Sequence, residues 1–159
     1  MILVMLGTQN NSFHRLLEEV QKCIDDKSID EEVIVQAGAT KFKSKDMKIF
    51  KLVSTKRLNE YVDNASYVIT HGGVGSIVSC IKKGKKVIAV PRYSKYGEHV
   101  NDHQLQIIQT FDSQGFIKGI KDISELEEAI KEIKDFKPQE FVSNTQNIIN
   151  IIDDFIQKN

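Results

Sequence analysis

Short apolar blocks recur along the chain and alternate with segments whose apolar residues fall at helical spacing. The blocks predict buried strands, because strands of a parallel sheet are covered on both faces. They span residues 2–6, 33–35, 67–69 and 87–90. A block at 47–53 alternates apolar and polar residues and predicts an edge or half-covered strand, and a short strand is predicted at 116–120.

The segments between the first strands predict helices with one apolar face. The first helix can be capped by Ser12, and its inward residues are Phe13, Leu16, Leu17, Val20 and Ile24. The second follows Ser54, and its inward residues are Leu58, Tyr61, Val62 and Ala65. The third spans 74–83 and stops at Gly84, which links the two central strands as a strand–helix–strand unit.

Three more helices are predicted after the strand at 87–90. The first of them directs three residues to the core, namely Leu105, Ile108 and either Phe111 or Phe116. Asp122 and Glu125 form a plausible capping box for the next, whose inward residues are Ile123, Leu126, Ile130 and Ile133. Residues 136–138 break that helix. A last helix is predicted over about 142–156, with Ile148, Ile149, Ile152 and Phe155 inward.

This alternation predicts one α/β domain over residues 1–159, a Rossmann-like parallel sheet with helices on both faces. Composition agrees with a soluble globular chain, since 40% of the residues are hydrophobic and 28% charged. The net charge of +0 gives no electrostatic signature of nucleic-acid binding. Cys23 and Cys80 fall inside predicted helices without metal-ligand spacing, so we expect buried, reduced thiols of a cytosolic protein. The N-terminal apolar run is too short for a signal peptide or a spanning helix.

Ligands of open parallel sheets bind beyond the carboxyl ends of the strands. The residues expected there are Gly7-Thr8, Ala37-Gly38, Pro91-Arg92 and the turn 71–76, which reads His-Gly-Gly-Val-Gly-Ser. A glycine after a strand can simply form a turn, which is an equally good explanation of Gly7 and Gly38. Three glycines within four positions exceed what a turn requires, so the turn 71–76 favours a phosphate site at the start of the following helix.

Several other kinds of site are excluded by their motifs. The chain has neither a Rossmann dinucleotide fingerprint nor a Walker loop, and Ser76 lacks the frame of a nucleophile elbow. His99 and His103 are four residues apart, but Glu98 does not lie between them as in a zinc-protease helix, and no metal is expected.

The segment 98–104, Glu-His-Val-Asn-Asp-His-Gln, is dense in short hydrogen-bonding side chains. Such groups suit sugar hydroxyls, and the segment lies on the same rim of the predicted sheet as the glycine turn. The alternative is a solvated loop in which Asn101 or Asp102 caps the next helix.

The chain resembles the donor-binding half of GT-B glycosyltransferases of the glycosyltransferase family 28 group. The resemblance rests on MLGTQ near the start, ITHGGVGS in the middle, and KKVIAVPR followed by YGEHVNDHQ. It is closest to the small bacterial subunits of capsule and exopolysaccharide synthesis and to the Alg13 subunit of eukaryotic N-glycan assembly. It implies a domain that binds a UDP-sugar as co-substrate and needs no cofactor or obligatory metal.

The resemblance also assigns residues to the donor. Those expected to face the nucleotide, its diphosphate or the sugar are Gly7, Thr8, His71, Gly72, Gly73, Val74, Gly75, Ser76, Ser79, Arg92, Asp102, His103 and Gln104. Many relatives carry a glutamate that holds the ribose where this chain has Ser79, and a serine binds a hydroxyl less strongly than a carboxylate does.

A GT-B enzyme has two such halves, and this chain supplies one. The resemblance therefore implies a membrane-anchored, acceptor-binding partner similar to Alg14, a lipid-linked saccharide acceptor, and a peripheral cytoplasmic location through that partner. We expect inverting hexosyl transfer, with the general base on the partner or at Glu98 or His99. Two alternatives stay open, namely a non-catalytic subunit that stabilises its partner and a receiver- or flavodoxin-like regulatory domain. The second predicts an acidic pocket or a flavin loop, and residues 7–10 offer neither.

Overall fold

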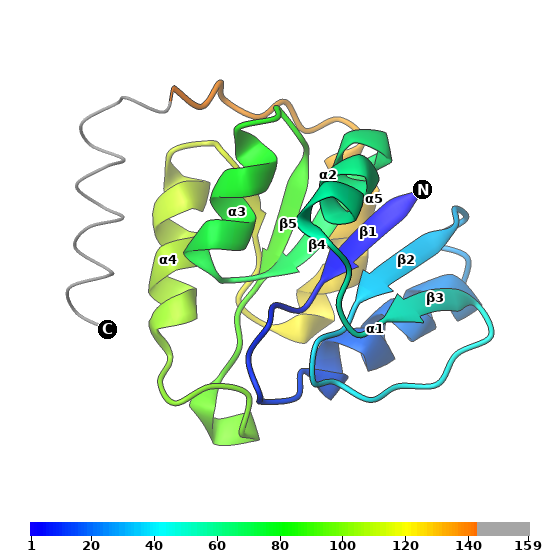
Figure 1. Cartoon of the computed structure of the whole chain (residues 1–159). Coiled ribbons are helices and arrows are strands. Elements are labelled where there is room, and N and C mark those ends of the chain that lie inside the picture. Colours follow the sequence, from blue (N-terminus) through cyan, green and yellow to red (C-terminus); the bar gives the residue numbers. More distant parts are fainter. Residues whose placement is uncertain (143–159) are drawn as a thin grey trace.

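A parallel sheet forms the centre of the chain (Figure 1). The computed structural model describes residues 1–142. Within them the strands pair in the order β3-β2-β1-β4-β5-β6, all in parallel. The strands are β1 (Ile2–Met5), β2 (Val33–Gln36), β3 (Met47–Phe50), β4 (Tyr67–His71), β5 (Val87–Val90) and β6 (Lys118–Gly119). The predicted α/β class with a parallel, Rossmann-like sheet is confirmed.

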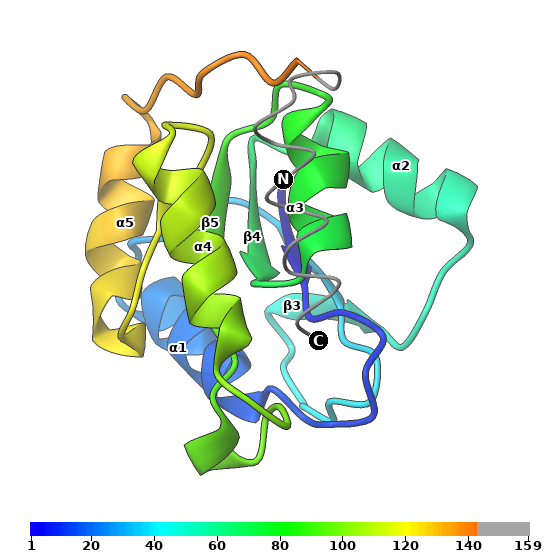
Figure 2. The same cartoon turned by 90° about the vertical axis from the view of Figure 1, so that its left-hand side faces the viewer.

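Helices cover both faces of this sheet (Figure 2). They are α1 (His14–Asp25), α2 (Thr55–Asn64), α3 (Val74–Ile81), α4 (His103–Ser113) and α5 (Leu126–Ile133), with short 3₁₀ turns η1 (Ser94–Tyr96) and η2 (Ile123–Glu125). Helices α1 and α5 pack on one face, and α2, α3 and α4 pack on the other. Figure 2 looks along the sheet and shows α1 and α5 on one side of it and α2 and α3 on the other.

Strand β1 contributes to both apolar layers because its side chains alternate between the two faces. Ile2 and Val4 belong to the layer under α1 and α5, whereas Leu3 and Met5 belong to the layer under α2, α3 and α4. All four are almost fully buried, which explains the unbroken apolar run in the sequence.

The two cysteines lie in different layers, Cys23 under α1 and Cys80 under α3, and both are free thiols. Burial raises the pKa of Cys23 to about 12 and that of Cys80 to about 11. The predicted burial of these residues is confirmed.

Element boundaries differ from the predicted ones at several places. Strand β3 ends at Phe50 rather than at residue 53, and β6 keeps only Lys118–Gly119 of the predicted 116–120. The predicted cap Ser12 is wrong. Helix α1 begins after Phe13, whose N–H donates to Oγ1 of Thr40 at 2.8 Å, so a hydroxyl from the β2–β3 loop takes the role of the local cap.

The predicted capping box is confirmed at the start of η2, which leads into α5. The Asp122 side chain accepts from the Ser124 N–H, and Glu125 accepts from the N–H of Asp122. The predicted last helix at about 142–156 lies outside the described residues, apart from Val142. Among residues 1–142 no helix is both long and apolar enough to cross a bilayer.

The strand order reverses between β1 and β4, because β2 and β3 extend the sheet on one side and β5 and β6 on the other. In doubly wound folds, the loops that leave two such strands diverge to opposite faces and open a crevice at their carboxyl ends. The architecture therefore places the candidate site after Met5 and after His71.

Candidate functional site

A cavity of about 360 Å³ lies at this switch point. Its walls come from the ends of β1, β2 and β4, the start of α3 and the β3–α2 connection. They comprise Met5, Gly7, Thr8, Gln9, Gln36, Leu52, Val53, Thr55, Leu58, His71, Gly73, Gly75 and Ser76. The cavity thus combines an apolar side from the β3–α2 connection with a polar side of glycines and short side chains.

Helix α3 points its N-terminus into this cavity, because Gly73, Gly75 and Ser76 all line it. Gly73 is the N-cap residue and supplies no side-chain acceptor to the first amides of the helix. The first turn of a helix has N–H groups without intrahelical partners and a partial positive charge. A β-carbon added to Gly75 would meet no atom within 4 Å, so the space above these amides is open. An anionic group such as a diphosphate fits there.

The imidazole of His71 forms the floor between two glycines. A β-carbon built on Gly7 would lie 2.6 Å from Nε2 of His71, and one built on Gly73 would lie 2.5 Å from its Cε1. Gly7 also has a φ of +84°, which side-chain-bearing residues rarely adopt. A side chain at either position would clash with the His71 ring, so both glycines are needed whether or not a ligand binds.

His71 is held as a neutral imidazole. Its side chain is buried, and desolvation, with a smaller effect of the Arg92 charge, lowers its pKa to about 3. Nδ1 lies 3.1 Å from the amide nitrogen of Gln104, a donor, so Nδ1 accepts and the proton lies on Nε2. Nε2 then donates to Oγ of Ser76 at 3.3 Å, which positions that hydroxyl at the cavity wall.

Gln104 joins the ends of β4 and β5 from the first turn of α4. Its Oε1 accepts from the N–H of Gly72 at 2.9 Å and from the N–H of Arg92 at 3.0 Å. The side chain is buried and its amide nitrogen contacts His71. A β-carbon on Gly72 would lie 2.8 Å from the Cβ of Gln104, so Gly72 permits the close approach of α4 to the glycine turn.

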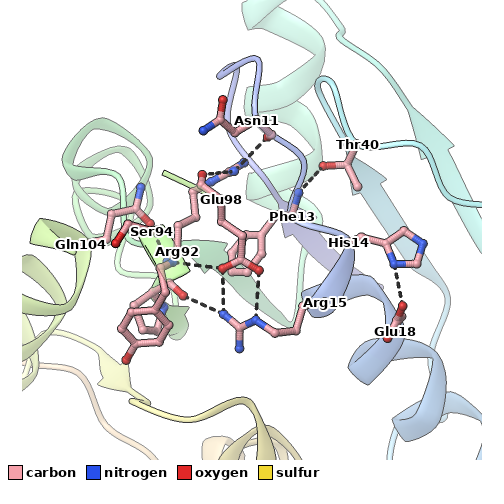
Figure 3. Close-up of polar contacts among 12 residues, drawn as sticks. Asn11, Phe13, His14, Arg15, Glu18, Thr40, Arg92, Ser94, Glu98 and Gln104 are labelled. Carbon is pink, nitrogen blue, oxygen red and sulfur yellow. Dashed lines mark hydrogen bonds and ion pairs between the residues drawn. The ribbon is translucent and has the colours of Figure 1, made fainter. Parts of the chain in front are cut away.

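Arg92 is a buried hub rather than a surface cation (Figure 3). Its guanidinium donates to the carbonyl oxygens of Asn11, Glu98 and Leu6. Burial lowers its pKa to about 10, although the nearby Glu98 carboxylate opposes the change. Its Nε has no hydrogen-bond partner among residues 1–142, and the guanidinium lies 5.0 Å from the ring centre of Phe13.

Glu98 anchors the β5–α4 loop to α1 (Figure 3). Its two carboxylate oxygens accept from Nε and Nη2 of Arg15, each at 3.0 Å, and one of them also accepts from the N–H of Tyr93. Nη2 of Arg15 reaches the Pro91 carbonyl as well. Because the Glu98 carboxylate is buried in this pair, its geometry is that of a structural anchor; its role as general base stays a prediction.

The predicted site residues fall into three groups. The first lines the cavity and comprises Gly7, Thr8, His71, Gly73, Gly75 and Ser76. The second lies behind that wall and supports it, namely Gly72, Arg92 and Gln104. Val74, inside the first turn of α3, packs against the core under that helix. The third lies outside the cavity lining and comprises Ser79 on α3 and Glu98, His99, Asp102 and His103 in the β5–α4 connection and at the start of α4.

Residues of the third group have local partners. Oγ of Ser79 donates to the Ser76 carbonyl, and Ser79 is exposed one turn along α3. The Asp102 carboxylate accepts from the N–H and hydroxyl of Ser94, which ties η1 to the start of α4. Asp102 is the N-cap residue by position, but Oδ1 of Asn101 accepts from the His103 N–H instead. Contact of these side chains with a donor stays a prediction.

The sequence analysis missed the side of the cavity formed by Gln36, Leu52, Val53 and Thr55. Gln36 offered a signal, since it is a polar residue directly after an apolar block and hence at a strand end. It is buried and donates to the Gly7 carbonyl at 3.0 Å, which fixes the first glycine loop. The β3–α2 connection offered no such signal. Within residues 1–142 no three His, Cys, Asp or Glu side chains gather where they could hold a metal ion.

Comparison with known proteins agrees with this geometry. The chain matches the glycosyltransferase family 28 C-terminal domain over residues 1–158. A curated relative, the UDP-N-acetylglucosamine transferase subunit ALG13 of Candida albicans, is 28% identical over 113 residues, which are 71% of this chain and 37% of the relative. The chain therefore spans well under half the length of that relative.

Two solved structures illustrate the shared fold. The solution NMR structure of ALG13 has a TM-score of 0.59 at 18% identity, covering 95% of this chain and 93% of that chain. The calicheamicin glycosyltransferase CalG4 also has a TM-score of 0.59, at 13% identity, covering 82% of this chain and 34% of that chain. Because the family match covers almost every residue, the chain belongs to the glycosyltransferase family 28 C-terminal domain family.

Proposed function

We propose that this chain is the donor-binding, catalytic subunit of a two-component inverting glycosyltransferase that transfers a hexose from a UDP-sugar. The observation that carries the proposal is the open N-terminus of α3 inside the switch-point cavity. Family membership and the likeness to a UDP-N-acetylglucosamine transferase subunit support the same reading.

Different walls of the cavity suit the diphosphate and the base of a uridine diphosphate. The first amides of α3 and the hydroxyl of Ser76 would receive the diphosphate, without an obligatory metal. The apolar side of Leu52, Val53 and Leu58 would pack against the base. The contact of Ser79 with the ribose is proposed from the family resemblance alone, since Ser79 lies one turn further along α3. The segment with Asp102 and His103 lies along the rim where the sugar is expected.

Transfer would proceed in one displacement. The acceptor hydroxyl oxygen bonds to the anomeric carbon as the bond from that carbon to the UDP oxygen breaks, and a general base takes the hydroxyl proton. The partner is the expected source of this base. On this chain His99 is the better candidate, because Glu98 is engaged with Arg15, whereas desolvation keeps the pKa of His99 below its usual value and its imidazole neutral.

We propose a membrane-anchored partner similar to Alg14 that binds a lipid-linked saccharide acceptor, with a role in capsule or exopolysaccharide synthesis. Support comes from the word "subunit" in the relative's name and from the fold, which is one half of a GT-B enzyme. The chain would then act at the cytoplasmic face of the membrane. The alternative is a non-catalytic, partner-stabilising subunit, which is favoured by Ser79 in place of the acid that holds the ribose in many relatives.

Substitution of Gly75 by valine tests the donor site. A β-carbon at this position has no neighbour within 4 Å outside its own helix, and the valine methyl groups would extend into the open space beside the first amides of α3, so we expect folding to persist and UDP binding to be lost. Calorimetric titration of UDP into the parent and Gly75→Val, each alone and with the partner, measures the effect. Gln106→Val places the same side chain at an exposed site of α4 and should bind UDP as the parent does.

Three outcomes separate the readings. Loss in Gly75→Val alone supports the donor site at α3. Equal UDP binding by the parent and Gly75→Val contradicts that placement. No binding by the parent, with or without the partner, supports the non-catalytic alternative.

A further inference from the structure

Lysines gather in two short segments of the chain, 82–86 and 41–51, and only the second borders a cavity at the strand ends. Segment 41–51 reads Lys-Phe-Lys-Ser-Lys-Asp-Met-Lys-Ile-Phe-Lys. The whole chain has a net charge of +0, so this excess is local. The donor cavity does not use it, because none of these lysines lines that cavity.

The first part of the segment is held rigidly with its lysines outward. Thr40, Phe42 and Ser44 are buried or half-buried, while Lys41, Lys43 and Lys45 between them are exposed. Each inward residue has a partner on or beside α1. Thr40 accepts from the Phe13 N–H, the ring of Phe42 lies 5.1 Å from that of His14, and Oγ of Ser44 donates to Gln21.

These lysines surround a second cavity, of about 590 Å³, beside the donor cavity. Lys41, Lys43 and Lys51 line it over an apolar floor that includes Ala37, Phe42 and Ile49. The two cavities adjoin at Gln36, which lines the donor cavity and donates to the carbonyl of Lys51.

The lysine charges are not neutralised within the described part of the chain. None of Lys41, Lys43, Lys45, Lys48 and Lys51 forms an ion pair with a carboxylate of residues 1–142, whereas Lys83, Lys118 and Lys131 all do. The one acid of the segment, Asp46, accepts from the side chain of Gln21. A row of exposed, uncompensated ammonium groups raises the local concentration of anions.

We propose that this lysine cavity docks the chain directly on an anionic lipid bilayer through headgroup phosphates. The charges are carried by lysines on a loop and a strand end, and the cavity lacks the helix terminus or arginine fork that usually defines a discrete phosphate site. Flexible lysines on a fixed backbone match a fluid array of headgroups.

This docking goes beyond the proposed function, since it requires neither donor binding nor the partner. It also differs from attachment through the partner alone. The donor cavity adjoins the lysine cavity, so docking would hold the donor site at the bilayer surface, where a lipid-linked acceptor is found.

Vesicle flotation of the purified chain, without partner or UDP-sugar, tests the proposal. We expect binding to phosphatidylcholine vesicles that contain about 30 mol% of the anionic lipid phosphatidylglycerol, and no binding to vesicles of phosphatidylcholine alone. The triple variant Lys41→Gln, Lys43→Gln, Lys51→Gln should bind roughly 100-fold more weakly, because each lysine at such a surface strengthens association about fivefold. Added salt should weaken the parent's binding.

A matched control removes the same charge elsewhere. The control variant is the triple substitution Lys82→Gln, Lys134→Gln, Lys137→Gln. These three lysines are exposed and lie outside both cavities, so the variant should bind vesicles within about threefold of the parent. Replacing Lys41, Lys43 and Lys51 by arginine should preserve vesicle binding. Equal losses in the two glutamine triples or no binding by the parent would each overturn bilayer docking. Displacement by millimolar pyrophosphate, but not by sodium chloride of the same ionic strength, would overturn it in favour of a discrete phosphate ligand.

Discussion

His71 is the residue on which the proposed donor site depends most, although little of it reaches the surface. Gly7 and Gly73 close over its ring, Ser76 accepts from it, and Gln104 fixes its tautomer. A substitution at Gly73 would therefore disturb the histidine before it disturbed a ligand. This is why Gly75, which faces open space, is the more informative probe of a bound diphosphate.

The buried, neutral state of His71 predicts a loss of stability on acidification. The folded pKa, about 3, lies below the usual value of 6.5, so the unfolded chain binds the proton first. The contribution of His71 is then complete above pH 6.5 and is lost as the pH falls toward 3. Between pH 7 and pH 5 we expect the free energy of unfolding to fall by about 2 kcal/mol on account of this group.

Urea unfolding of the parent and His71→Gln at pH 7 and pH 5 measures this loss. The variant should be less stable than the parent at pH 7 and should lose about 2 kcal/mol less on acidification. His14, His99 and His103 are unchanged in the variant, so the difference reports on His71 alone. The same acid-induced loss in both proteins would show that His71 titrates normally.

At the scale of elements, the link between α1 and the β5–α4 loop shapes the rim. Arg15 comes from α1, Glu98 and Pro91 come from the loop, and Tyr93 and Tyr96 lie beside the Arg15 guanidinium at 5.7 and 4.7 Å. The side chains of Arg15 and Glu98 are 20% and 4% exposed, so their ion pair is shielded from water. Removing one partner of such a pair costs far more than breaking an exposed pair, because the remaining charge is left buried and uncompensated.

Arg15→Gln is therefore expected to lower the free energy of unfolding by about 3 kcal/mol, because it leaves the buried Glu98 carboxylate without its cation. In the same variant, the backbone amides of residues 93–99 should exchange hydrogen faster than in the parent. His14→Gln is the matched control, since the neighbouring His14–Glu18 pair is exposed on the same helix and should cost under about 0.5 kcal/mol. Urea unfolding measures both, and equal costs would mean that the Arg15 pair does not anchor the loop.

The sequence predicted the strands and helices of residues 1–142 because their apolar patterns are local. It misplaced features that depend on distant residues. Thr40 rather than Ser12 provides the hydroxyl at the start of α1, where it accepts from the N–H of Phe13, and β6 is short because only Lys118 and Gly119 form ladder pairs with β5. The glycine turn was found from its composition, but its purpose was only partly foreseen. Nothing local in the chain predicts that Gly7 and Gly73 flank one imidazole.

At the scale of the molecule, three large apolar side chains are exposed on loops that follow strand ends. Leu52, Tyr96 and Val100 are 57%, 53% and 86% exposed, and they lie in the β3–α2 and β5–α4 connections. Apolar and aromatic residues on one rim are typical of a protein interface. The rim around the proposed donor cavity is thus the expected contact surface for the proposed partner.

We expect the isolated chain to show no glycosyl transfer and to gain it with the acceptor-binding partner. One half of the cleft cannot orient an acceptor hydroxyl toward the anomeric carbon, and such orientation can contribute roughly 7–11 kcal/mol to the barrier. Assays with a series of UDP-sugars and a lipid-linked acceptor, with and without partner, measure the difference. Gly75→Val with partner is the inactive control. Turnover by the chain alone would contradict the two-subunit reading.

The strand order has a consequence for how the chain is made. Ile2 pairs with Val33 on one side and with Tyr67 on the other, so the second edge of β1 stays open until β4 has been synthesised. Pairings between such distant residues form slowly. Both the central strand and the cavity therefore wait for the middle of the chain to leave the ribosome, and until then an apolar strand edge is exposed to other nascent chains.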